Sequence, residues 1–348
     1  MSDAGRARPV PRSPRVRPEG TKPTVVRRCA PDLTPVSDSE VYDSIAVTIA
    51  LDSPNSLESA SRLFQHGRQT LVLDDCLDWL RAAPSNSISA VVTDPPYGLV
   101  EYQPDQQQKL RAGRGGIWRI PPSFDGSSRR PLPRFTVLSA NDRQAVTVFF
   151  REWATALIRV ARPGAHVFIA GNPLVGPLVS TAMEASGFER RGEIVRLVRT
   201  FRGGDRPKGA EDEFKSVSSM PRSCWEPWGL YRKPIDQPTV AANLRVWGTG
   251  GLRRLSEKTP FLDVIESGVT PARERSLAPH PSVKPQAFLR QIVRAALPLG
   301  TGVVLDPFAG CATTLAACEA LGVQGIGIEI DEHYFRLAAR AIPKLAAL

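Results

Sequence analysis

The sequence predicts an α/β fold built around a doubly wound, mostly parallel β-sheet. Short apolar segments rich in β-branched residues, such as Ile88–Thr93 and Gly302–Leu305, alternate with longer segments such as Phe149–Ala161 that carry apolar residues at helical spacing. Strands buried on both faces of a parallel sheet have continuous apolar runs, and their alternation with helices is typical of doubly wound sheets. Acidic residues follow several of the apolar runs, at the position where open α/β sheets hold ligands.

The remaining elements follow from the same patterns. We expect further strands at 69–73, 165–170, 193–198 and 323–328. We expect further helices at 74–82, 177–186, 285–296, 313–321 and 332–345. Arg162-Pro163-Gly164 is expected to end the helix before the strand at 165–170, because proline and glycine interrupt helices.

Length, charge and cysteine content exclude several classes of protein. The chain has 348 residues and a formal net charge of +10, and none of its apolar runs approaches the roughly 18 residues of a membrane span. The amino-terminal residues include Arg and Pro where a secretory signal has an apolar block, so we expect no export. Five cysteines, odd in number and never in CxxC spacing, argue against a disulfide scaffold and a structural zinc site. We therefore expect a cytoplasmic protein with no membrane partner and no metal.

Polar segments precede and interrupt the α/β pattern. Residues 1–30 contain eight basic and two acidic residues without apolar periodicity, which predicts a disordered basic arm, either a solvated tail or a nucleic-acid contact. Residues 31–67 have mixed signals and stay unassigned. Residues 101–140 and 200–279 are rich in polar residues, Gly and Pro, and are too polar to form core.

The first segment with chemical potential follows the strand that ends in Asp306. A turn of small residues, Pro307-Phe308-Ala309-Gly310-Cys311-Ala312, opens the next helix and lets the backbone approach a ligand. Glu329 ends the following strand 23 positions later (329 − 306), the distance at which nucleoside-binding sheets place a carboxylate against ribose hydroxyls. Because the loop is neither GxGxxG nor GxxxxGK[ST], a nucleoside without a phosphate linker fits better than a dinucleotide. The alternative is an ordinary tight turn.

The second segment is Thr93-Asp94-Pro95-Pro96-Tyr97-Gly98, directly after a buried strand. The two prolines fix the backbone and lack N–H donors, so the carbonyl groups and the Asp94 carboxylate present acceptors. Tyr97 adds a flat aromatic face. This arrangement suits a planar group that bears an NH₂. The alternative is a proline-rich loop that only ends a strand.

These segments resemble the motifs of the amino-group DNA methyltransferases. Asp94-Pro95-Pro96-Tyr97 resembles the catalytic motif, and Asp306-Pro307-Phe308-Ala309-Gly310 resembles the S-adenosylmethionine loop. His280-Pro281-Ser282-Val283-Lys284-Pro285 resembles the HPxxKP segment that precedes this loop, and residues 70–77 resemble the strand and acidic residue before the catalytic strand. The catalytic motif comes first and the methyl-donor motif last, which is the order of the permuted, beta-type N6-adenine/N4-cytosine family, over roughly residues 68–342.

The resemblance implies a Rossmann-like methyltransferase fold with a permuted motif order and polar DNA-recognition insertions. Residues 68–199 would form the catalytic half, with the insertion 101–140, residues 200–279 the target-recognition region, and residues 280–348 the S-adenosylmethionine-binding half. The implied catalytic residues are Asp94, Pro95, Pro96 and Tyr97. The implied methyl-donor pocket consists of Asp306, Phe308, Gly310, Glu329, Lys284 and Asp75. Ala312 stands where the family commonly has Gly, so its methyl group would lie near the donor.

The resemblance also implies a partner and a reaction. Double-stranded DNA is the expected partner, and the target base must be flipped out of the duplex for chemistry. Asp at position 94 favours the N6 amine of adenine, because Ser is commoner there in the N4-cytosine enzymes of the family. An N4-cytosine methyltransferase is the nearest alternative. A non-catalytic DNA-binding module and a nicotinamide oxidoreductase are more distant ones, and the missing glycine-rich phosphate loop disfavours the latter.

DNA contacts are expected on the two polar segments. The basic residues concerned are Arg111, Arg114, Arg119, Arg129, Arg130 and Arg134 in the first, and Lys208, Lys215, Arg222, Arg232, Arg245, Arg253 and Arg254 in the second. Trp225 and Trp228 are expected to pack at a late strand, and His280 to orient the donor loop. A homodimer and a cognate restriction enzyme are further partners that the sequence leaves open.

Overall fold

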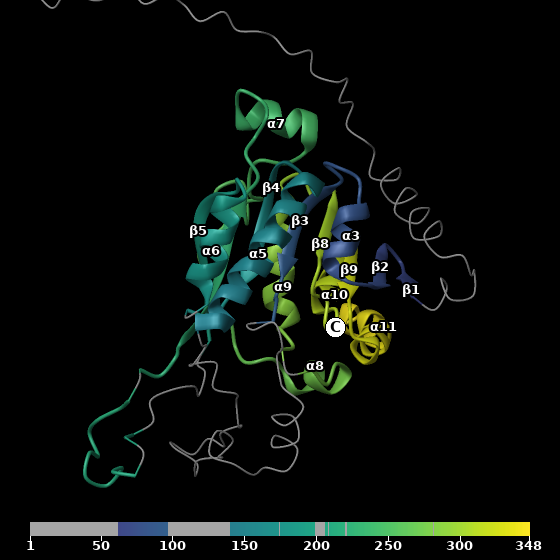
Figure 1. Ribbon diagram of the computed structural model, residues 1–348. Helices are drawn as coiled ribbons and strands as arrows, with labels where there is room; N and C mark the ends of the chain where they lie inside the picture. Colours follow the sequence, from purple (N-terminus) through teal and green to yellow (C-terminus); the bar gives the residue numbers. More distant parts are fainter. Residues whose placement is uncertain are drawn as a thin grey trace, which may run out of the picture. The chain divides into compact units, whose positions relative to one another are not determined.

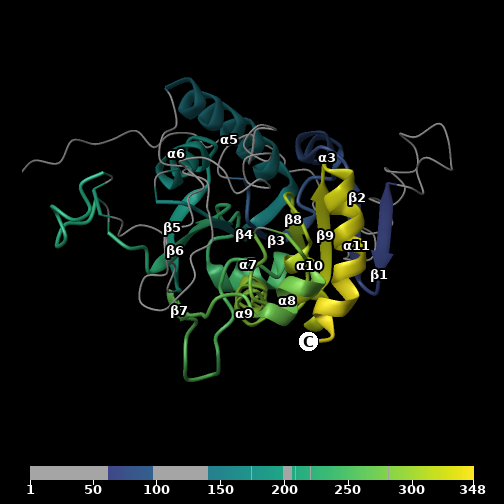
Figure 2. The same ribbon diagram turned by 90° about the horizontal axis from the view of Figure 1, so that it is seen from below.

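A computed structural model describes residues 62–96, 140–198 and 206–348, apart from 174, 208, 220 and 281. Within these residues, one sheet of nine strands has the order β1-β2-β9-β8-β3-β4-β6-β5-β7, with helices on both faces (Figures 1 and 2). The basic arm 1–30, most of the unassigned segment 31–67 and nearly all of the insertion 101–140 lie outside the described residues. None of the described helices is long and apolar enough to cross a membrane.

The sheet is mostly parallel, as the alternating pattern predicts. Its strands are β1 (Leu63–His66), β2 (Gln69–Leu73), β3 (Ile88–Thr93), β4 (Ala161–Ala170), β5 (Glu189–Leu197), β6 (Trp225–Arg232), β7 (Val264–Glu266), β8 (Val303–Asp306) and β9 (Gln324–Glu329). The central run β2-β9-β8-β3-β4 is parallel throughout, and β5 pairs with β7 in parallel. β1 is antiparallel to β2, and β6 is antiparallel to both β4 and β5.

Two layers of helices bury the sheet. The helices are α3 (Cys76–Ala82), α5 (Ala140–Val160), α6 (Gly176–Ala185), α7 (Val240–Trp247), α8 (Ala272–Leu277), α9 (Gln286–Ala296), α10 (Thr313–Ala320) and α11 (Glu332–Ala346). Figure 2 shows α3, α5 and α6 on one side of the sheet, opposite α9, α10 and α11. Successive strand residues face opposite layers, so Val91 packs with Trp153 and Leu157 of α5, whereas Val92 packs in the core that contains Phe288 and Ile292 of α9.

Two boundaries differ from the prediction for local reasons. α5 begins at Ala140, nine residues before the predicted start at Phe149, because its first turns are exposed and bury only Val146. β4 begins at Ala161 and contains Arg162-Pro163-Gly164, which were predicted to separate helix from strand. The helix ends at Val160, as predicted, but the strand already begins at Ala161 instead of Ala165, and Arg162-Pro163-Gly164 lie at an irregularity where the residue paired with β3 shifts from Ala161 to His166.

The polar segment 200–279 contributes to the central sheet. β6 lies between β4 and β5, and Trp228 is fully buried in it, as predicted, while Trp225 at its first position is 38% exposed. Composition alone does not predict β6, because charged residues, Glu226 and Arg232, lie near both of its ends. β1 was also not predicted, because it lies in the segment left unassigned.

Candidate active site

Parallel strands bring four acidic residues to one edge of the sheet. Asp75 follows β2, Glu329 ends β9, Asp306 ends β8 and Asp94 follows β3. The register aligns these ends, because Leu73 pairs with Glu329 across the β2–β9 ladder. The carboxyl edge, as we call this edge, is where an open α/β sheet offers space for a ligand.

A hydrogen bond joins the two motifs that the sequence singles out. Thr93 Oγ1 donates to Asp306 Oδ1 at 2.7 Å, across 213 positions of sequence. The backbone N–H of Phe308 donates to the same oxygen at 3.3 Å. Burial raises the pKa of Asp306 to about 6, although the hydrogen bonds that its carboxylate accepts, including those from Thr93 and Phe308, oppose the shift. Asp94 follows Thr93 directly, so the predicted catalytic and donor motifs lie side by side.

The Glu329 side chain accepts a hydrogen bond from the loop that follows β8. Its Oε2 accepts from the Gly310 N–H at 2.7 Å and its Oε1 accepts from the Asp331 N–H at 2.8 Å. Burial raises the pKa of Glu329 to about 7. Gly310 has a φ of +54°, a conformation that favours glycine, and a Cβ there would lie in van der Waals contact with the His280 ring at 3.4 Å.

Ala312, which departs from the family pattern, is buried in the core. Its φ of 55° is left-handed, which explains why glycine is common at this position. The side chain is fully buried and belongs to the apolar cluster that contains Leu71, Leu315 and Phe335. The extra methyl group therefore packs in the core, and its expected position near the donor stays a prediction.

Aromatic side chains of α5 support the loop from one side. The Phe308 ring lies 5.8 Å from the Trp153 ring and 6.1 Å from the Phe149 ring, measured between centroids. Trp153 is fully buried, while Phe308 is half-buried. The α5 helix thus fixes the position of the predicted donor loop.

His280 packs against the same loop from the other side. Its ring lies 4.5 Å from the Tyr334 ring, and its Nδ1 accepts from the Ser282 N–H at 3.1 Å. Burial lowers the pKa of His280 to about 4, so the ring is neutral at pH 7. This placement beside Gly310 agrees with the expected orienting role.

The acidic residues after β2 have structural partners. Asp75 caps α3, because its Oδ1 accepts from the Leu77 N–H at 2.7 Å and from the Asp78 N–H at 3.4 Å. Asp74 pairs with Arg62 at 2.9 Å. Asp75 thus has a capping role, and its contact with the donor stays a prediction.

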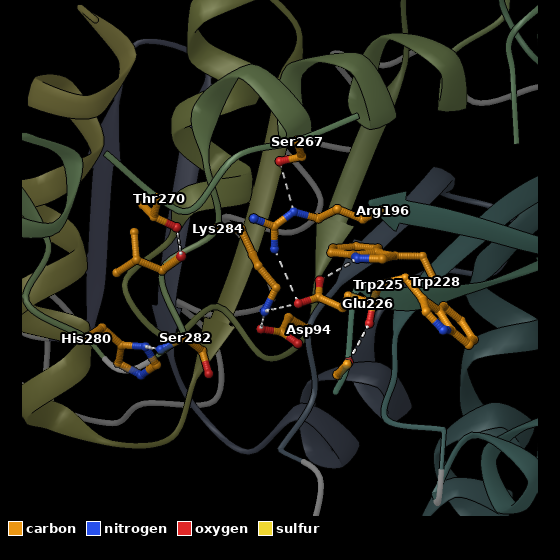
Figure 3. A network of polar contacts seen from close by, with 12 residues as sticks. Asp94, Arg196, Trp225, Glu226, Trp228, Ser267, Thr270, His280, Ser282 and Lys284 are labelled. Carbon is orange, nitrogen blue, oxygen red and sulfur yellow. Dashed lines mark hydrogen bonds and ion pairs between the residues drawn. The ribbon is translucent and has the colours of Figure 1, made fainter. Parts of the chain in front are cut away.

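Lys284 has partners other than those expected. The sequence places Lys284 in the donor pocket, but in the structure its ammonium forms an ion pair with Asp94 Oδ2 and lies 4.0 Å from Glu226 Oε2 (Figure 3). Burial alone would lower the pKa of this ammonium, yet the carboxylates of Asp94 and Glu226 outweigh burial and raise the pKa. Lys284 therefore contacts the catalytic motif through its ion pair with Asp94.

Sequence reasoning missed Glu226 and Arg196, which complete this group. Arg196 Nη1 lies 3.3 Å from Glu226 Oε2, and the Trp228 Nε1–H donates to Glu226 Oε1 at 2.8 Å. Burial opposes ionisation of Glu226, but Lys284 and Arg196 lower its pKa. The sequence signal for this group is a glutamate between two tryptophans in a segment expected to be a late strand. A charged residue in such an apolar segment is buried only when it is paired, so it predicts a buried ion pair.

The remaining residues of the catalytic motif are described in part. Pro95 is buried and Pro96 half-buried, directly after Asp94, whereas Tyr97 lies outside the described residues. Across the part of the chain that is described, no three His, Cys, Asp or Glu side chains are grouped so that they could hold a metal ion.

The basic residues of segment 200–279 do not share one face. Arg232 is buried, pairs with Glu189 at 2.6 Å and donates to the Gly250 carbonyl, so its prediction as a DNA contact is wrong. Arg245 lies on α7, which contacts the start of β4 through the Asn243 side chain and the Pro163 carbonyl. Figure 1 shows α7 at the opposite end of the sheet from α8 and the carboxyl edge. Lys208 and the arginines of the first insertion lie outside the described residues.

Comparison with known proteins identifies the family of the chain. A family model for N6/N4 methyltransferases, described as DNA methylase, matches residues 88–340. The Type II methyltransferase M2.DpnII of Streptococcus pneumoniae is 30% identical over 279 residues, which are 80% of this chain and 91% of that protein. The DNA adenine methyltransferase YhdJ of Escherichia coli K12 is 44% identical over 63 residues, which are 18% of this chain and 21% of that protein.

A solved structure shows the same fold. The PvuII DNA methyltransferase, which is cytosine-N4-specific, superposes with a TM-score of 0.50 at 12% sequence identity, covering 80% of this chain and 92% of its own. The family match spans both motifs, and their order along the chain is catalytic first and donor last. The chain therefore belongs to the beta-type, permuted family of N6-adenine and N4-cytosine DNA methyltransferases.

Proposed function

We propose that this DNA methyltransferase modifies the exocyclic N6 amine of adenine and takes the methyl group from S-adenosylmethionine. The placement of the Asp94 carboxylate carries the proposal. It follows a buried strand, is held by Lys284, and lies one residue from the hydroxyl that bonds Asp306. A flipped base at the carboxyl edge would thus meet an acceptor beside the loop predicted to hold the donor.

The chemistry follows from what an exocyclic amine requires. Its lone pair is delocalised into the ring, so the amine is a weak nucleophile. Asp94 and the Pro95 carbonyl would accept hydrogen bonds from the two N–H groups of the amine. Acceptors placed for a pyramidal nitrogen stabilise the transition state more than the planar ground state. Tyr97 would stack on the base. Because both reactants are held at one edge, proximity lowers the barrier further.

The residues around the β8–α10 loop suit a nucleoside without a phosphate linker. Gly310 admits close approach, Phe308 offers a half-buried ring, and Glu329 presents a carboxylate at the end of β9 for ribose hydroxyls. S-adenosylmethionine would supply a methyl group activated by its sulfonium. Asp306 would complete the pocket, and Asp75 would reach it from the end of β2.

Two observations support adenine over cytosine. Position 94 is Asp, where N4-cytosine relatives more often have Ser. The relative that shares 44% identity over 63 residues is named a DNA adenine methyltransferase. The cytosine-N4-specific structure is 12% identical and supports the fold alone.

Transfer of a labelled methyl group tests the proposal. Protein, tritiated S-adenosylmethionine and duplex DNA of mixed sequence are incubated, and the DNA is digested to nucleosides. We expect label in N6-methyl-2′-deoxyadenosine. Asp94→Asn removes the charge at constant shape and should lower kcat by roughly 100-fold or more while donor affinity stays within a few-fold. Label in N4-methylcytosine would overturn the base assignment, and full activity of Asp94→Asn would overturn the mechanism.

A further inference from the structure

Two cross-strand pairs of glutamate and arginine lie on the β5–β6 ladder. Glu189 is directly opposite Arg232 at one end, and Arg196 is directly opposite Glu226 at the other. Their closest nitrogen–oxygen distances are 2.6 Å and 3.3 Å. Buried charges are costly to desolvate, so a buried ion pair is weak support for stability and calls for another explanation.

Among the described residues, the Arg196–Glu226 pair is linked to the catalytic motif through Lys284. Arg196, Glu226, Lys284 and Asp94 form a chain of alternating charge that ends at the predicted catalytic carboxylate (Figure 3). The side chains of Arg196 and Lys284 are 5% and 8% exposed, so water screens this chain little. In the other pair, Arg232 donates to the Gly250 carbonyl and Glu189 also lies 3.9 Å from Arg191 Nη1.

Neighbouring groups hold Glu226 and Arg196 in one orientation each. Trp228 binds one oxygen of Glu226, and Arg196 binds the other. Arg196 also donates to Ser267 Oγ and to the Gly268 carbonyl, both at 3.0 Å. The Lys284 stem, in contrast, has four rotatable carbons and a compact ammonium, so its position depends on the anions around it.

We propose that Glu226 and Arg196 are positioning residues for methyl transfer, which hold the Lys284 ammonium against Asp94 and so fix the orientation of the carboxylate that receives the target amine. This inference rests on the proposed function, because Asp94 is there the acceptor for that amine. Nothing in the family resemblance assigns a role to either residue. A misplacement of about 1 Å in a reacting group costs up to roughly 100-fold in rate, so a fixed carboxylate matters for turnover more than for binding.

Substitution of the two glutamates on one ladder gives a matched experiment. Glu226→Gln keeps the shape and the acceptor for Trp228 but loses the charge, and Glu189→Gln makes the same change at the other end. We expect Glu226→Gln to lower kcat by roughly 10- to 100-fold, with KM for DNA and donor affinity within about threefold. Glu189→Gln should keep a kcat close to that of the unmodified protein. Equal kcat values for the two variants would overturn the inference.

The pH profile separates positioning from a loss of structure. Lys284 faces Asp94, Glu226 and Arg196, with His280 and Cys311 also within electrostatic reach. Glu226→Gln removes one of the two carboxylates that raise the pKa of Lys284, while Asp94 remains and burial and Arg196 still lower it. The pKa of Lys284 should therefore fall, and the alkaline limb of kcat in Glu226→Gln should move to lower pH. An unchanged profile shape would contradict the inference, because a merely structural loss scales the profile without moving it.

A double variant covers the case in which Glu226→Gln folds poorly. Arg196→Gln with Glu226→Gln leaves no uncompensated charge, and neutral replacements of buried pairs are often tolerated. We expect low kcat with an alkaline limb closer to that of the unmodified protein, and an unchanged kcat would overturn the inference. If the unmodified protein transfers no methyl group to DNA, the proposed function itself fails, which distinguishes that failure from equal activities of the two single variants.

Discussion

Burial shifts the pKa of two carboxyl groups at the carboxyl edge, those of Glu329 and Asp306. It raises the pKa of Glu329 to about 7 and that of Asp306 to about 6, in both cases against hydrogen bonds that favour the anion. Glu329 has an ordinary pKa of 4.5, so folding favours its protonated form. The ligand-free protein therefore loses stability as pH rises from about 4.5 to about 7 at this residue.

The same shift predicts a pH-dependent donor affinity. Hydroxyl groups donate more strongly to a carboxylate than to a carboxylic acid, so binding through Glu329 favours the anion. With a pKa of about 7, the ionised fraction rises about tenfold between pH 6 and pH 8. We expect the Kd for S-adenosylmethionine, measured by calorimetry, to fall about tenfold over this range. Glu329→Gln should bind more weakly and with a much flatter pH dependence, and an equally steep dependence in that variant would assign the effect to another group.

At the scale of elements, the start of α3 combines a cap with a predicted ligand contact. Asp75→Ala removes the cap and should lower the free energy of unfolding by about 1 kcal/mol, measured by urea denaturation. Asp75→Ser retains a capping oxygen and should be close to the unmodified protein in stability. If the carboxylate also contacts the donor, both variants lose donor affinity. Restored affinity in Asp75→Ser would limit Asp75 to its capping role.

How well the sequence predicted an element depended on where its stabilising contacts lie. β3 and β8 were predicted because their buried, unbroken apolar runs are local signals. β6 was obscured because Glu226 and Arg232 are charged, and their partners lie on β5, about 30 and 43 positions away. The same reason hid the positioning pair, since no local pattern reveals which distant arginine a glutamate meets. Lys284 was found by its motif, but its partner Asp94 is 190 positions away and only the fold brings them together.

At the scale of the whole molecule, exposed basic residues lie at both ends of the sheet strands, some at the carboxyl edge and some at the opposite edge. Lys215 belongs to the connection between β5 and β6, which leaves the sheet where β4 ends. Arg245 is exposed on α7, beside the start of β4. DNA whose base reaches Asp94 must approach the carboxyl edge, so the two residues should differ although both were predicted as DNA contacts.

Salt-dependent DNA binding tests this orientation. Lys215→Gln should weaken binding and reduce the slope of log K against log salt by about 0.9, the value for one lost phosphate contact. Arg245→Gln makes the same change of charge at the other edge and should leave both quantities unchanged. A loss confined to Arg245→Gln would place the DNA on the wrong edge for the proposed chemistry.

The central claim is that two motifs 213 positions apart build one site at the carboxyl edge. A crystal structure of the protein with S-adenosylmethionine bound tests it most directly. We predict the donor beside the loop from Asp306 to Ala312, with its ribose hydroxyls on Glu329 and its methyl group directed toward Asp94. A donor bound at another part of the sheet, or one whose methyl group faces away from Asp94, would contradict the account.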